Sequence, residues 1–239
     1  MSPRTPLLRP DRYFADRDPT IPRLGVVFLV LLAAGPAIVY GVGWVLTANV
    51  DGTLLVDNPR RPPDWACEDP PSAGSAFAES CDEPRQLERD VDAVLWAAVG
   101  EYVGPAFLGF PLAVLVLTGL LHGGVKLFEP GRGRVRSLTL AAWGTLPAVV
   151  VAPVALVGLA MAIDPVTVSP GDDPAAVLEA VRRGVEAAGP FTSATTVIAA
   201  VWGGVIWRFG LVHQHALDAT EATLVAGVVA LVTAAFGVA

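Results

Sequence analysis

Long uncharged stretches, separated by short charged segments, dominate the chain. Each stretch has about 18 residues or more, and a helix of that length crosses a hydrocarbon core of about 30 Å. A surface helix of a water-soluble protein keeps a polar face, whereas the interiors of these stretches carry no charge on any face. The pattern therefore predicts membrane-spanning helices at about residues 24–48, 102–125, 137–163, 190–208 and 222–239.

A further helix is expected just before the fourth span. Asp173 can cap it, Pro174 suits its first position and Gly189 can end it. Its apolar side chains recur at helical spacing at Val177, Leu178, Val181, Val185 and Ala188. A second amphipathic helix is expected after Pro84, leading into the second span.

The fold class that follows is all-α: a polytopic transmembrane helix bundle of about five spans, with short amphipathic helices in the outer loops. Four and six spans remain alternatives, because the fourth stretch opens with Gly189 and Pro190 and the last stretch is barely long enough. Small residues four positions apart let helices approach closely. We expect them to pack within the bundle, with a dimer face as the alternative, at Gly119 with Gly123, Ala37 with Gly41, and Ala200 with Gly204.

The distribution of Arg and Lys predicts the orientation of the spans, because cytoplasmic segments beside spans are enriched in these residues. Residues 1–23 carry five Arg, and the connector after the second span carries Lys126, Arg132, Arg134 and Arg136. The acidic loop 49–93 has four Arg against eleven Asp or Glu and is expected outside. Five spans then give a cell-membrane protein with its N-terminus in the cytoplasm and its C-terminus outside.

The net charge of −7 and the single Lys bear on the type of organism. Acidic loops with Arg in preference to Lys are typical of proteins from salt-loving archaea, where high ionic strength screens the repulsion among the charges. A GC-rich genome also favours Arg, Ala, Gly and Pro. The two explanations are compatible.

Both cysteines, Cys67 and Cys81, lie in the acidic outer loop 49–93. A disulfide between them would close a loop of about 15 residues and contribute about 3 kcal/mol in the chain-entropy model. Disulfides persist outside the cytoplasm, so the compartment permits this bridge. The sequence leaves the bridge and two free thiols as equal expectations. No His lies near the two thiols, which argues against a metal site.

The N-terminal segment 1–23 places aromatic side chains beside arginines just before the first span. Such a segment can lie at the headgroup level, with its rings in the apolar layer and its guanidinium groups near phosphates. We expect an interfacial anchor, with a partner-docking motif as the alternative, formed by Arg9, Pro10, Arg12, Tyr13 and Phe14.

Several short motifs follow one another along the chain: Leu-Leu-Arg-Pro-Asp-Arg-Tyr-Phe at 7–14, Gly-Gly-Val-Lys-Leu-Phe-Glu-Pro-Gly at 123–131, Ser-Leu-Thr at 137–139 and Ala-Trp-Gly-Thr-Leu-Pro at 142–147. Their order and the five-span layout resemble the Yip domain family of Ypt-interacting membrane proteins, here an archaeal-type member. The resemblance implies a membrane domain over residues 24–239 with a cytoplasmic N-terminus. Eukaryotic relatives bind Rab-type GTPases in vesicle traffic. A GTPase partner is doubtful here, because the long N-terminal region of those relatives has no counterpart in this sequence.

No arrangement of residues in the sequence predicts catalysis. The chain has no phosphate loop, no zinc-protease motif and no hydrolase nucleophile motif. His213 and His215 point to opposite sides of a helix, and His122 stands alone near a span end. We therefore expect no enzyme, no cofactor, no metal site and no nucleic-acid partner. The expected partners are the lipid bilayer and other membrane proteins or a second copy of the chain.

The predicted function is a non-enzymatic membrane protein of Yip type, acting as a scaffold or membrane-organising component. The alternative is a small transporter or channel. Prolines at 36, 111, 147 and 153 can kink helices around a cavity, but no ionisable residue lies in the middle of a span. The polar candidates for a pathway are Thr118, Thr145, Ser193, Thr195 and Thr196.

Overall fold

The computed structural model describes residues 5–18, 20–68, 75–128 and 133–238. Expectations that concern Ala239 or the stretch 129–131 lie outside the described residues. The elements, in chain order, are α1 (Pro10–Asp16), α2 (Ile21–Asn49), β1 (Val50–Asp57), α3 (Asp64–Cys67), α4 (Ala76–Cys81), β2 (Gln86–Asp90), α5 (Val91–Phe128), α6 (Arg134–Ala162), β3 (Val166–Val168), α7 (Pro174–Ala187), α8 (Gly189–His215) and α9 (Ala219–Val238).

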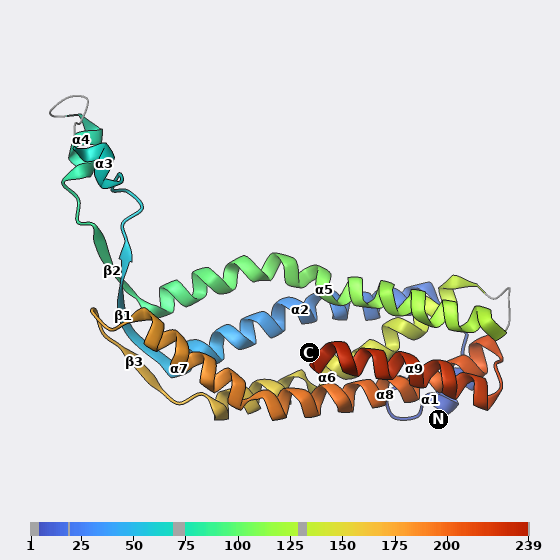
Figure 1. Ribbon diagram of the computed structural model, residues 1–239. Helices are drawn as coiled ribbons and strands as arrows, with labels where there is room; N and C mark the ends of the chain where they lie inside the picture. Colours follow the sequence, from blue (N-terminus) through green and yellow to red (C-terminus); the bar gives the residue numbers. More distant parts are fainter. Residues whose placement is uncertain (1–4, 19, 69–74, 129–132, 239) are drawn as a thin grey trace.

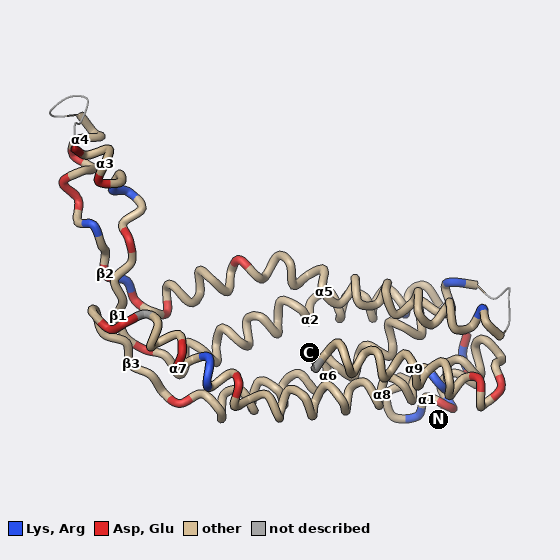
Figure 2. The backbone as a smooth tube through the Cα atoms, in the orientation of Figure 1, with Lys and Arg blue, Asp and Glu red and all other residues tan. Residues whose placement is uncertain are grey.

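Five helices within the described ranges are long and apolar enough to cross a membrane, namely α2, α5, α6, α8 and α9. Each coincides with one of the five uncharged stretches, which confirms the polytopic helix bundle. The charged residues gather toward the two ends of the bundle and on the arm that projects from it (Figure 2). This segregation follows from the cost of placing charge in hydrocarbon.

The central helix of the bundle is α6, which packs against α8, α5 and α2. In turn, α2 pairs with α5, and α9 packs on α8 (Figure 1). Residues 139–147 of α6 are all buried, on every side of the helix. A helix surrounded in this way has no polar face, which explains why this stretch shows no amphipathic pattern.

At two glycines, α6 and α8 come into close contact. A Cβ on Gly144 would collide with Nε1 of Trp207, and a Cβ on Gly203 would lie 2.5 Å from the Gly144 carbonyl oxygen. The Trp207 indole is 1% exposed, and its N–H donates a hydrogen bond of 3.0 Å to the Leu140 carbonyl. Glycine is therefore required at Gly144 because the indole occupies the space of a side chain.

The expectation of close packing at paired small residues is correct for two positions and wrong for one pair. Cβ atoms on Gly41 and Gly204 would press against Leu156 and Ala230 of neighbouring helices. In contrast, Cβ atoms on Gly119 and Gly123 would meet nothing within 4 Å. The packed face of α5 consists instead of Val114, Leu117, Leu121 and Val125, so the two glycines share a face that points away from the bundle.

A three-stranded sheet, absent from the all-helical expectation, lies at the end of the bundle where α2 and α6 end and α5 begins. In the order β2-β1-β3, β1 pairs antiparallel with β2 and parallel with β3. Gly52 of β1 has a φ of +114°, and a Cβ there would collide with the Val168 carbonyl of β3. A small core of Val50, Val91 and Val168 joins the sheet to α5 and α7.

The two amphipathic helices differ from each other in outcome. The Asp173 side chain accepts a 3.0 Å hydrogen bond from the Ala175 N–H and caps α7, as expected. The helix expected after Pro84 begins only at Val91, because Leu87 belongs to β2 and pairs with Val56. Pairing with β1 provides the backbone hydrogen bonds of this segment, and the helical spacing of its apolar residues gives no sign of that pairing.

Within the acidic loop 49–93, the described residues 49–68 and 75–93 form an arm rather than a plain loop. Strands β1 and β2 carry a head that projects from the bundle (Figure 1). In the head, Cys67 and Cys81 form a disulfide, with their Cα atoms 5.7 Å apart. The Arg61 guanidinium donates to the carbonyls of Cys81 and Glu83, so the head is tied across its base.

Replacing Gly144 with Ala should destabilise the bundle. The added methyl group forces Trp207 away from α6, and overpacking of this kind costs about 1–3 kcal/mol. We expect a lower midpoint of thermal unfolding in detergent, followed by tryptophan fluorescence. Gly119→Ala is the matched control, since its methyl group enters open space and alanine is the better helix former, so the midpoint should stay unchanged or rise slightly. Equal midpoints for the two variants would contradict the proposed role of the contact.

Candidate functional site at the arginine end of the bundle

The end of the bundle opposite the sheet gathers most of the basic residues near the spans. Here α2, α6 and α9 begin and α8 ends, and α1 lies beside them (Figure 1). We call it the arginine end, after Arg9, Arg12, Arg17, Arg23, Arg134 and Arg136.

The short helix α1 docks against the bundle through its aromatic side. Pro10, Tyr13 and Phe14 are buried, whereas Arg9 and Arg12 are exposed. The Tyr13 ring lies edge-on to Trp143 of α6, with the ring centroids 5.5 Å apart. The rings of Tyr13 and Phe14 therefore contact protein. A position of the segment at the headgroup level stays a prediction.

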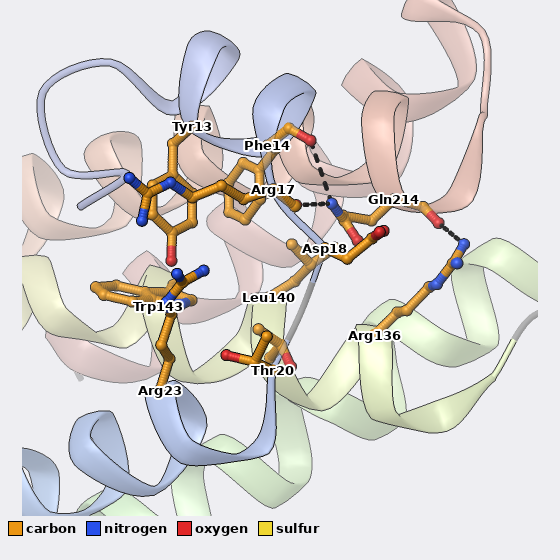
Figure 3. A pocket seen from close by; sticks show the side chains of 11 residues that line it. Tyr13, Phe14, Arg17, Asp18, Thr20, Arg23, Arg136, Leu140, Trp143 and Gln214 are labelled. Atoms are coloured by element: carbon orange, nitrogen blue, oxygen red, sulfur yellow. Dashed lines mark hydrogen bonds between the residues drawn. The ribbon is translucent and has the colours of Figure 1, made fainter. Parts of the chain in front are cut away.

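Three hydrogen bonds from α8 fix the backbone of this segment. The Trp202 indole N–H donates to the Leu7 carbonyl at 2.7 Å. The Gln214 amide donates to the Phe14 carbonyl at 3.2 Å and to the Arg17 carbonyl at 2.8 Å (Figure 3). Both carbonyls lie at or beyond the last turn of α1, where the helix leaves its own acceptors unpaired. The docking therefore satisfies backbone groups as well as burying rings.

The residue that joins these helices is Gln214, in the last turn of α8. Its side chain holds α1, and its own backbone carbonyl accepts a hydrogen bond from the Arg136 guanidinium of α6 (Figure 3). The side chain is 5% exposed, and its Oε1 has no hydrogen-bond partner among the described residues. Leaving a buried amide oxygen without a hydrogen bond costs free energy. This oxygen is therefore suited to accept a hydrogen bond from a donor outside the chain.

A small cavity of about 10 Å³ lies beside Gln214, enough for one water molecule. Charged residues that line it are Arg17, Arg23, Arg136 and Asp18 (Figure 3). The Arg17 guanidinium lies 5.5 Å from the centre of the Tyr13 ring, which suits a cation–π contact. Burial raises the pKa of the Tyr13 hydroxyl, and the positive charges of Arg23 and Arg17 oppose that shift.

A second polar cluster at the same end joins three spans. The hydroxyl of Ser137 on α6 lies 3.4 Å from Nδ1 of His122 on α5 and 3.3 Å from Nε2 of His215 on α8. Ser137 and His215 are both fully buried. The cluster therefore joins α5, α6 and α8 through buried polar side chains.

The remaining candidate ligands, His213, His215, Cys67 and Cys81, do not form one site. His213 is exposed while His215 is buried, so the two do not share a ligand. Across the described ranges, no three His, Cys, Asp or Glu side chains are grouped to hold a metal ion. Cys67 and Cys81 lie in the projecting head at the opposite end. Sequence reasoning missed Gln214, Trp202 and the Ser137 cluster, because polar residues in a helical span carry no signal of their partners.

A family model of the Yip1 domain matches residues 5–239. The chain belongs to the Yip1 domain family. A comparison with curated proteins and with solved structures found no match. The family match confirms the resemblance to the Yip domain family, and the archaeal type stays a prediction. The match includes α1 as well as the five spans. A Yip1 domain with five apolar helices makes this a multi-pass membrane protein, which fits a non-enzymatic membrane component.

Replacing Gln214 with Leu should release the N-terminal segment. The variant keeps a side chain of similar size but removes both hydrogen bonds to the backbone carbonyls of Phe14 and Arg17. Since two such bonds contribute about 1–3 kcal/mol together, we expect trypsin to cleave after Arg12 and Arg17 about tenfold faster. Gln86→Leu at the sheet end is the control. An unchanged cleavage rate would mean that the rings of α1 suffice for docking.

Proposed function

We propose that this Yip1 domain protein is a non-enzymatic scaffold that organises membrane proteins, or copies of itself, through its docked N-terminal segment. The observation that supports this role is the division of α1 into two faces. Tyr13 and Phe14 face the bundle, whereas Arg9 and Arg12 are exposed. A segment held rigidly by one face presents the other without a further entropy cost on binding, which favours recognition.

The charge on the exposed face favours a protein partner over a bare lipid surface. Asp11 and Asp16 are exposed beside Arg9 and Arg12, so the face carries both signs. Adsorption to an anionic membrane is weakened by such acids, whereas a protein surface can match each charge with its opposite. The neighbouring Leu8, which is 86% exposed, adds an apolar anchor to this face.

We further propose that the arginine end faces the cytoplasm and that the sheet end, the arm and the C-terminus lie outside, in the cell membrane. The basic residues beside the spans support this orientation. The acidic arm and the disulfide in its head agree with an extracytoplasmic compartment.

Labelling with a membrane-impermeant thiol reagent tests this orientation in intact cells. The background carries Cys67→Ser and Cys81→Ser, and single cysteines replace the exposed residues Thr5, Glu79 and Thr220. We expect the reagent to label only the variant with cysteine at 79, because the other two positions lie at the arginine end. Labelling at Thr5 or Thr220 before the cells are broken open would reverse the orientation.

Charge reversal on α1 tests the scaffold role. We expect the double variant Arg9→Glu with Arg12→Glu to lower, by about tenfold, the amount of partner recovered after cross-linking in native membranes. Differently tagged copies of the chain, expressed together, measure self-association in the same experiment. The control is Arg182→Glu with Arg183→Glu, a pair of exposed arginines on α7. Equal recovery from both double variants would contradict a partner site on α1.

A transporter is the second candidate, favoured by a cavity of about 360 Å³ between α5, α6, α8 and α9. Thr145, Thr195 and Thr196 line it. The hydroxyls of Thr145 and Thr195 donate to carbonyls of their own helices, so they offer a solute little unused hydrogen-bonding capacity. Solute flux through reconstituted protein that changes in Thr145→Val or Pro147→Ala would favour this candidate over the scaffold.

A further inference from the structure

We propose that the cavity beside Gln214 is a binding site for an anionic phospholipid headgroup that carries a hydroxyl group. The phosphate lies at the mouth between Arg17 and Arg23, and the headgroup hydroxyl enters and donates to Gln214 Oε1. This site goes beyond the scaffold role, because partner contact uses Arg9 and Arg12 and lipid contact uses the residues that line the cavity.

The arginines of the cavity lie at the depth of lipid phosphates. Arg23 is the last charged residue before the uncharged run of α2, and Arg136 is the last before that of α6. A charged residue at such a border lies where hydrocarbon gives way to headgroups. Guanidinium groups bind phosphate oxygens in pairs, which distinguishes them from a lysine at the same place.

The start of α2 adds to the attraction for an anion. The N-cap residue Thr20 lines the cavity, and its side chain makes no capping hydrogen bond. The first turn of α2 therefore keeps backbone N–H groups without a side-chain acceptor, at the positive end of the helix dipole. An oxygen of the phosphate can take the place of the missing cap.

The buried amide of Gln214 specifies the hydroxyl. Both of its N–H groups already donate to carbonyls of the N-terminal segment, which fixes the orientation of the amide. The other atom, Oε1, must therefore be an acceptor, and it has no donor among the described residues. The cavity of about 10 Å³ admits only one small group, such as a hydroxyl.

The charge balance favours an anionic lipid over a zwitterionic one. Three arginines and one aspartate line the cavity, a net charge of +2. A single phosphodiester charge complements this balance, whereas a quaternary ammonium brings further positive charge and offers no hydrogen-bond donor.

Native mass spectrometry of the full chain in detergent measures the binding of defined lipids with the same acyl chains. We expect phosphatidylglycerol to bind about fivefold more tightly than phosphatidylmethanol, which has the same charge but lacks a hydroxyl group. Phosphatidylcholine should bind more weakly than both. Equal affinity for phosphatidylglycerol and phosphatidylmethanol would overturn the role of Gln214 Oε1.

The variants separate this site from general surface charge. We expect Arg17→Gln with Arg23→Gln to lower the affinity for phosphatidylglycerol about tenfold, and Arg23→Lys to lower it in part because the paired geometry is lost. Arg134→Gln, at an exposed arginine of the same end that does not line the cavity, is the matched control and should leave the affinity unchanged. An equal loss in the control would overturn the site. Arg23→Lys keeps the test valid if the double variant does not fold.

Soluble phosphate esters distinguish the source of the headgroup chemistry. Glycerophosphoglycerol carries the same phosphodiester and headgroup hydroxyl groups without acyl chains. If the ligand is a lipid, this ester should not displace phosphatidylglycerol when the two are present at equal concentration. Displacement under these conditions would overturn the lipid assignment in favour of a soluble ligand. Partner recovery through Arg9 and Arg12 is measured separately, so either proposal can fail alone.

Discussion

Close contact between α6 and α8 at Gly144 and Gly203 sets the positions of the other helices. In a bilayer, lipid tails are as apolar as helix surfaces, so association depends on close packing and on hydrogen bonds between helices. Both occur here, because Trp207 fills the space above Gly144 and its indole N–H donates to the Leu140 carbonyl. On either side of this contact, α6 packs against α2 and α5, and α8 packs against α9 and α1.

Polar groups in the bundle follow two different rules according to depth. Within the spans, hydroxyls donate to carbonyls four residues earlier in the same helix, as at Thr118, Thr145 and Thr233. These bonds satisfy the side chains internally and leave the lipid-exposed surface apolar. At the arginine end, polar side chains instead cross between elements, through Ser137, Arg136 and Gln214. The second kind of contact determines the geometry of the candidate site.

The sequence predicts the parts of the fold that depend on local pattern. Uncharged length is enough to find the spans, and Asp173 with Pro174 is enough to find α7. The sheet escapes prediction because β1 and β3 are over 100 residues apart in the chain, as the pairing of Val50 with Val166 shows. The residues around Gly52 can be recognised as a strand only once their partner strand β3 is known.

The docking of α1 escapes prediction for the same reason. The donors Trp202 and Gln214 lie 195 and 200 positions from the carbonyls that they bind. Aromatic residues beside arginines predict a border between apolar and charged surroundings, and that border is equally met by lipid or by protein. In the structure the rings of Tyr13 and Phe14 are buried against the bundle, whereas Arg9 and Arg12 are exposed.

One side chain couples the two properties that we assign to the arginine end. The Gln214 amide donates twice to the N-terminal segment, and its buried oxygen has no donor among the described residues although Gln214 lines a small cavity. A hydrogen bond accepted by that oxygen polarises the amide and strengthens the bonds that its N–H groups donate. A headgroup in the cavity thus stabilises the docked state of α1, which holds Arg9 and Arg12 in place. Because coupling between two sites is reciprocal, a partner that binds docked α1 must also tighten the binding of that lipid.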